Sequence, residues 1–166
     1  MSMSVLILVL LLLSGVAYLF GRQRSLALAG RAGGIRALHS LPSYYGFYAA
    51  LWCALPALLV LGIWGLFQST IVTELLVRDL PAELRDLPPD RLGLVINDIR
   101  NLAGGSAMAQ QASPEILAAA EHLRGLRATA QSAVAVLVLA LGIIGGGLAW
   151  RRVSPRLRAR NRVEAV

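Results

Sequence analysis

Three long apolar runs without a charged side chain constrain this chain more than any other feature. They cover residues 3–20, 46–67 and 132–150. A helix needs about 20 apolar residues to cross a hydrocarbon core of about 30 Å, and each run meets that length. Backbone groups inside lipid must satisfy one another, so such runs are expected to be helices. The sequence therefore predicts an all-α integral membrane protein whose three transmembrane helices cover residues 1–20, 45–68 and 132–150.

The distribution of charge predicts how these helices are oriented. Every basic residue is arginine, four in residues 21–44 and six in residues 151–166, against one acid, Glu164. By the positive-inside rule both basic segments face the cytoplasm, and the N-terminus and residues 69–131 face outward. Residues 69–131 carry six arginines and eight acids, a balance of 6 − 8 = −2. The arginine-only composition suggests a bacterial source.

Aromatic residues at the ends of the apolar runs agree with this orientation. Membrane interfaces are rich in Trp and Tyr, and we expect anchors at the inner end of the second and third runs: Tyr44, Tyr45, Phe47, Tyr48 and Trp150. The net charge of +7 is explained by arginines that flank the spans and lie near anionic lipid. Nucleic acid is therefore not an expected partner, whereas membrane lipid is.

The segment between the second and third spans carries clear helix signals. Asp90 is a candidate N-cap for a helix over residues 91–103, which Gly104 and Gly105 should end. Ser113 before Pro114 is a second start signal, and no strong breaker follows until residue 150. One continuous helix over residues 114–150 is expected. Its apolar stripe should pack on that of residues 91–103, forming a small helical cap.

Small residues mark candidate contacts between the spans. Gly142 and Gly146 form a G-x-x-x-G pattern, and Ala50 and Ala54 repeat small-x-x-x-small in the second run. In lipid, helices associate through close packing over such residues. The alternative is that glycine is simply common in membrane helices. Pro56 is expected to kink the second span.

Residues that could carry chemistry are nearly absent. The sequence has no phosphate-binding glycine loop, and its two histidines, His39 and His122, lie on segments predicted to face opposite sides. We therefore expect no catalytic, cofactor-binding or metal-binding residue, no cofactor and no enzyme activity. The interleaved acids and arginines of residues 78–91 are read as a solvated, salt-bridged surface. No Asp, Glu, Lys, Arg or His lies within a span, and intramembrane charges usually mark ion paths.

Several segments resemble a known family. Residues 38–42 (LHSLP), 44–46 (YYG) and 50–56 (ALWCALP) resemble the N-terminal extension of bacterial phosphate ABC transporter permeases of the PstC type. Residues 154–164 are similar to the junction before the permease core in that family. The resemblance implies an inner-membrane location and a part in ATP-driven phosphate uptake. It also implies the partners: the remaining permease core, a second permease subunit, an ABC ATPase and a periplasmic phosphate-binding protein.

Two classes of function remain open from the sequence. In such permeases a multi-span core follows where this chain ends at Val166, which would make the chain a fragment or a split gene product. Its role is then that of an accessory or regulatory segment of the permease. The alternative is the input half of a bacterial membrane receptor, in which two spans flank a helical outer domain. The long helix over residues 114–150 suits that alternative, whereas the extra first span does not.

Overall fold

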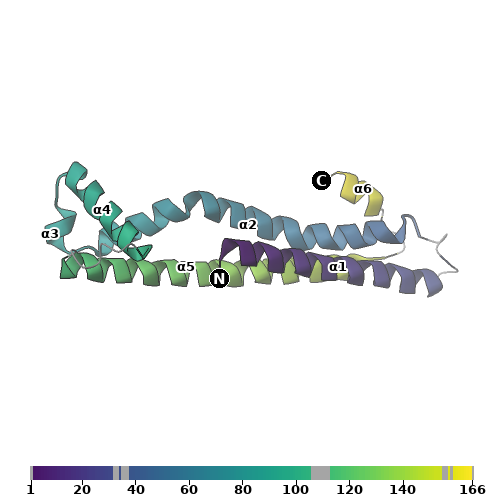
Figure 1. Cartoon of the computed structure of the whole chain (residues 1–166). Coiled ribbons are helices and arrows are strands. Elements are labelled where there is room, and N and C mark those ends of the chain that lie inside the picture. Colours follow the sequence, from purple (N-terminus) through teal and green to yellow (C-terminus); the bar gives the residue numbers. More distant parts are fainter. Residues whose placement is uncertain are drawn as a thin grey trace. The chain divides into compact units, whose positions relative to one another are not determined.

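All secondary structure in the described part of the chain is helical (Figure 1). The structure is a computed structural model that describes residues 2–31, 34, 38–105, 113–154, 157 and 159–165. The elements are α1 (Met3–Arg31), α2 (Pro42–Asp79), α3 (Ala82–Arg85), α4 (Pro89–Ala103), α5 (Pro114–Arg152) and α6 (Ala159–Glu164). Of these, α1, α2 and α5 are long and apolar enough to cross a membrane. The expected all-α class with three such helices is confirmed, while Arg36, Arg156 and Arg158 of the basic segments lie outside the described residues.

The long helices extend well past the apolar runs that predicted them. α1 continues through Arg22 and Arg24 to Arg31, and α2 continues from the second apolar run to Asp79. Arginine, leucine and alanine are good helix formers, so charge ends an apolar run without ending a helix. α2 instead ends just before Pro81, which cannot donate a helical hydrogen bond. Hydropathy thus located the helices but not their ends.

The chain divides into two compact units, which we describe separately. The spanning unit comprises Met1–Gly62 and Val134–Val166, and the cap unit comprises Ile63–Ala133. In the spanning unit α1, α2 and α5 each contribute to one buried cluster of small and branched side chains. Its members are Leu6, Leu10, Ala57, Leu61, Ala135 and Val138.

The cap unit has its own apolar core. Ile99 and Leu102 of α4 are buried against Ala119, Ala120 and Leu123 of α5, which confirms the expected packing of the two stripes. The last turns of α2 complete this core with side chains that the apolar pattern had not assigned: Val72 and Leu76, followed by Leu80. The core of the cap therefore includes the end of α2, with Leu84 of α3 packed against it, besides the two helices that the sequence suggested.

Local capping explains where α4 and α5 begin and end. Asp90 is not the N-cap of α4, so that prediction was wrong: Pro88 is, and Pro89 takes the first helical position. Gly105 follows α4 with φ of 91°, the left-handed conformation that glycine supplies at helix ends. The Ser113 Oγ accepts a hydrogen bond from the Ile116 N–H at 3.4 Å, so the predicted start of α5 is confirmed.

Arg124 secures the end of α4 in a way that the sequence did not indicate. Its guanidinium on α5 donates to the carbonyl oxygen of Leu102 at 2.6 Å and to that of Ala103 at 3.0 Å. The last carbonyls of a helix lack partners within the helix. This side chain supplies two of the missing donors and so ties α4 to α5.

The arginine asymmetry predicts the membrane orientation, and the structure identifies suitable probe positions. With Cys53 replaced by alanine, single cysteines at Gln23 and Ser154 should resist a membrane-impermeant maleimide in intact cells, whereas one at Asn97 should react. All three positions are exposed, but Ser25 is fully buried and would resist from either side. After permeabilisation all three should react. Labelling at positions 23 and 154 but not 97 would reverse the orientation.

Candidate functional site

Among the described glycines, Gly145 of α5 leaves the least room for a side chain. A Cβ built there would collide with the carbonyl oxygen of Trp52 on α2. The predicted pair Gly142 and Gly146 is also in contact, but less closely: a Cβ at Gly146 would lie 3.4 Å from the Cβ of Cys53. One at Gly142 would meet side chains of α1 at 3.1 and 3.3 Å. The three glycines therefore bring α5 against both of the other long helices.

Pro56 leaves the carbonyl oxygen of Trp52 without its usual helical donor. Proline has no N–H, so Pro56, which lies inside α2, cannot donate to the carbonyl oxygen four residues earlier, and that oxygen belongs to Trp52. The position that a Cβ of Gly145 would take collides with this same oxygen, so a Gly145 Cα–H points at it instead. A Cα–H is a weak hydrogen-bond donor. In this way a neighbouring helix covers the carbonyl that proline leaves open.

On α2 the buried small residues lie one position before the predicted ones. Ala50 and Ala54 are half-buried, whereas Ala49, Cys53 and Ala57 are buried at 0–1% exposure. Both sets have the same spacing of four residues, so the spacing alone does not tell which of two adjacent helix faces makes the contact.

A second close crossing, between α1 and α2, was not foreseen. A Cβ at Gly21 would lie 2.7 Å from the Tyr45 carbonyl oxygen, and one at Gly46 would lie 2.9 Å from the Tyr18 carbonyl oxygen. Gly21 follows the first apolar run directly and Gly46 begins the second. A search for glycine patterns at both edges of the runs, rather than within one run, would have found this pair.

Polar contacts join α1, α2 and the segment after α5 within the spanning unit. The Arg24 Nε donates to the Val153 carbonyl oxygen at 3.4 Å, and its guanidinium carbon lies 4.2 Å from the centre of the Trp150 ring. The Tyr45 hydroxyl donates to the Leu157 carbonyl oxygen at 3.0 Å. Such a cation over an aromatic face is attracted by the ring electrons, so Arg24 has a structural role besides its charge.

Burial of two tyrosines corrects the predicted aromatic anchors. Tyr45 and Tyr48 are 0% and 4% exposed, so they pack inside the protein and do not face lipid headgroups. Tyr45 lies in a buried cluster with Val153 and Ala159. Phe47, by contrast, is half-exposed. Aromatic residues are typical of the membrane–water interface. Only those on the side of the helix that faces away from the protein can reach that interface.

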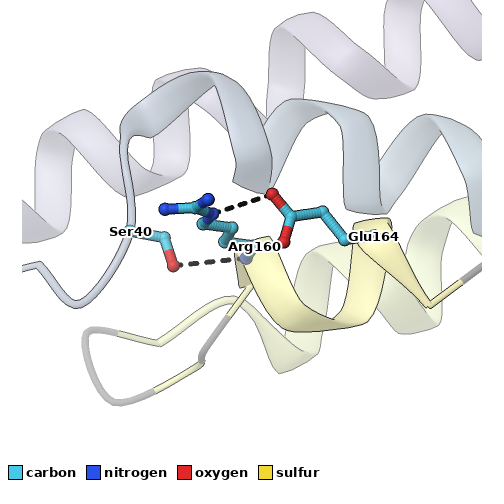
Figure 2. A network of polar contacts seen from close by, with 3 residues as sticks. All are labelled: Ser40, Arg160 and Glu164. Atoms are coloured by element: carbon cyan, nitrogen blue, oxygen red, sulfur yellow. Dashed lines mark hydrogen bonds and ion pairs between the residues drawn. The ribbon is translucent and has the colours of Figure 1, made fainter.

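The C-terminal helix α6 is held by a short polar network (Figure 2). The backbone N–H of Arg160 donates to the Ser40 Oγ at 3.2 Å, and the Arg160 Nε donates to the Glu164 Oε1 at 2.7 Å. The hydrogen bond to Glu164 and the charge of that carboxylate raise the pKa of Arg160. The hydrogen bond to Ser40 ties the basic tail to the residues just before α2.

The cap unit contains a polar pocket of about 490 Å³ among α2, α4 and α5. Two guanidinium groups, Arg100 and Arg127, line it together with hydroxyl, amide and apolar residues: Gly65, Gln68, Ser69, Val72, Thr73, Leu123 and Gln131. Its volume falls within the range of about 300–1,000 Å³ that is usual for small-ligand pockets. No local pattern in the sequence predicts that these residues come together, because they lie on three separate helices.

The histidines and acids do not assemble into a metal centre within the described residues. No group of three or more His, Cys, Asp or Glu side chains comes together there. The His122 Nε2 instead lies 3.0 Å from the Asp79 Oδ2, which links the end of α2 to α5. Arg85 lies 3.6 Å from its neighbour Asp86, which is one instance of the salt-bridged surface expected there.

The Gly145 contact yields a test with a matched neighbour. Gly145→Ala should lower stability by about 1–3 kcal/mol, because the added Cβ overlaps a backbone oxygen and the helices must move apart. Gly147→Ala should be neutral or mildly stabilising, because nothing lies within 4 Å of a Cβ there and alanine favours helix by about 1 kcal/mol over glycine. Thermal unfolding in detergent measures both. Equal unfolding temperatures for the two variants would contradict the contact.

Comparison with known proteins gives one match. A family model described as "Phosphate ATP-binding cassette transporter" matches residues 7–108, which is more than half of the 166 residues. The matched stretch contains most of α1, all of α2 to α4, and both sides of the Gly21–Gly46 crossing. No curated protein and no solved structure matched the chain. By this match the chain belongs to the phosphate ATP-binding cassette transporter family.

Proposed function

We propose that this chain is a membrane-embedded accessory or regulatory segment of a phosphate uptake permease of the PstC type, and that it is not itself catalytic. The observation that carries the proposal is the family match over α1 to α4. The same match counts against the receptor alternative, for which the length of α5 is the one favourable feature.

The exposure of the long helices supports a role in contacting other membrane proteins. The most apolar windows of α1, α2 and α5 are only 17%, 17% and 33% buried inside the chain. Most of their apolar surface is thus available to lipid tails or to helices of a partner. An apolar groove of about 340 Å³ between α1 and α5, lined by Phe20, Ile143 and Trp150 among others, offers further surface for such packing.

The proposed setting follows from the family and from the arginine asymmetry. The chain resides in the bacterial inner membrane, with the cap unit in the periplasm and the basic segments in the cytoplasm. Its protein partners are the permease core, the second permease subunit and the ABC ATPase, with the periplasmic phosphate-binding protein as a further candidate for the cap unit. Nucleic acid is not among them, because the arginines flank apolar runs.

Transport by the chain alone is not expected. None of the three apolar runs contains Asp, Glu, Lys, Arg or His, and charged groups at membrane depth usually mark ion pathways. The sequence also lacks the glycine loop that cradles nucleotide phosphates. Bracing or regulating a permease core requires neither feature.

Reconstitution tests the accessory role. Residues 1–166 in liposomes, with ATP inside and labelled phosphate outside, should show no uptake and no ATP hydrolysis. Adding the ATPase subunit should still give no uptake, and no ATP hydrolysis beyond that of the ATPase subunit alone. In native membranes, a tagged chain should co-purify with the ATPase subunit in mild detergent, whereas tagged Gly145→Ala should retain less of it. Phosphate uptake above that of empty liposomes, or co-purification with a histidine kinase instead, would overturn the proposal.

A further inference from the structure

We propose that the polar pocket of the cap unit binds a phosphate oxyanion through Arg100 and Arg127. The ligand is either free inorganic phosphate or the phosphate of a lipid headgroup, since both present the same oxygens. The inference depends on the side chains that line the pocket and not on the proposed transport role.

The charges around the pocket favour an anion. Arg100 of α4 and Arg127 of α5 line it, and no carboxylate is among its lining residues. Within the described residues, no carboxylate lies within 4 Å of either guanidinium. Two other arginines of the cap are engaged elsewhere: Arg124 donates to carbonyls of α4, and Arg85 lies beside Asp86. Two positive charges thus share one pocket without a protein counter-ion.

Hydrogen bonds hold one of the two guanidinium groups in place. An Arg100 Nη donates to the Thr73 Oγ1, and the Thr73 hydroxyl in turn donates to the Ser69 carbonyl oxygen at 2.6 Å. A guanidinium carries five N–H donors in a planar fork, so this contact orients Arg100 and leaves the other donors for a ligand. Arginine forks match the oxygens of phosphate in pairs, which makes them common in phosphate recognition.

The remaining pocket walls suit an oxyanion as well. Val72 and Leu123 are buried at 4% and 1% exposure, and such apolar surfaces strengthen nearby charge interactions because they exclude water. Gln68 and Gln131 supply amide donors from α2 and α5. Each glutamine directly adjoins an apolar run, residues 46–67 or 132–150, which is the level where lipid headgroups lie. At this level the phosphate of a lipid headgroup can reach the pocket as well as the free ion can.

The experiment uses the full chain purified in a maltoside detergent, which carries no phosphate. Equilibrium dialysis against radiolabelled inorganic phosphate measures free-ion binding. The shift in unfolding temperature on adding short-chain phosphatidylglycerol, compared with a phosphate-free galactolipid, measures headgroup binding, because a ligand of the folded state raises that temperature. The test variant is Arg100→Gln/Arg127→Gln. Its control, Arg78→Gln/Arg91→Gln, removes the same charge from exposed arginines outside the pocket.

The expected result is saturable binding of one of the two probes by the native chain. The pocket variant should bind about tenfold more weakly or worse, because it loses charge-assisted hydrogen bonds, while the control should change binding less than about twofold. Binding of dialysed phosphate identifies the free ion, and a shift with phosphatidylglycerol alone identifies the headgroup.

Folding and charge are controlled separately. Helical content by circular dichroism should match the native chain in every variant, and Arg100→Lys/Arg127→Lys, which keeps the charge without the fork, should bind with intermediate strength. The proposal is overturned if neither probe binds the native chain, or if the control variant weakens binding as much as the pocket variant. If the tagged chain fails to co-purify with the ATPase subunit, the accessory role is contradicted but the binding result is unchanged. The two proposals therefore fail independently.

Discussion

Hydrocarbon offers no hydrogen-bond partner, and the arrangement of the long helices follows from that constraint. Each backbone carbonyl in a span must find a donor within the protein. Pro56 removes one donor inside α2, and the carbonyl oxygen left open, that of Trp52, is the atom with which a Cβ at Gly145 of α5 would collide. Closing α5 over this oxygen also brings Gly142 and Gly146 against their neighbours. The carbonyl that lacks a helical donor and the tight contact of α2 with α5 thus involve the same atom.

The sequence predicted the helical class and the three spanning helices because long uncharged apolar runs have few other solutions in lipid. It also predicted the start of α5, since Ser113 and Pro114 carry a local signal that tertiary contacts do not override. Helix ends beyond the runs were not predictable from hydropathy: the arginines of α1 are good helix formers, and α2 persists to Asp79. Asp90 failed as a cap because the proline before it already begins α4.

The contact residues were harder to predict than the helices. Small residues four positions apart occur both at Ala50 and Ala54 and at Ala49 and Cys53. Only the packed structure shows that the second face is the buried one. The pocket with Arg100 and Arg127 was harder still to predict from the sequence, because its walls come from residues 65–73, 100 and 123–131. No short motif encodes such a set. The chain's family assignment and this pocket therefore rest on different information, the first on sequence and the second on packing.

The contact at Gly145 has a consequence for natural variation in this chain. Glycine is the one amino acid without a chiral centre, and each of the other nineteen carries a carbon where Gly145 meets the Trp52 oxygen. Every missense change in that codon therefore introduces the same steric fault, whatever its polarity, and no substitution there is conservative. Two codons later, at Gly147, the space is open. Two glycines that lie two positions apart and look equivalent in the sequence thus differ sharply in which substitutions they tolerate.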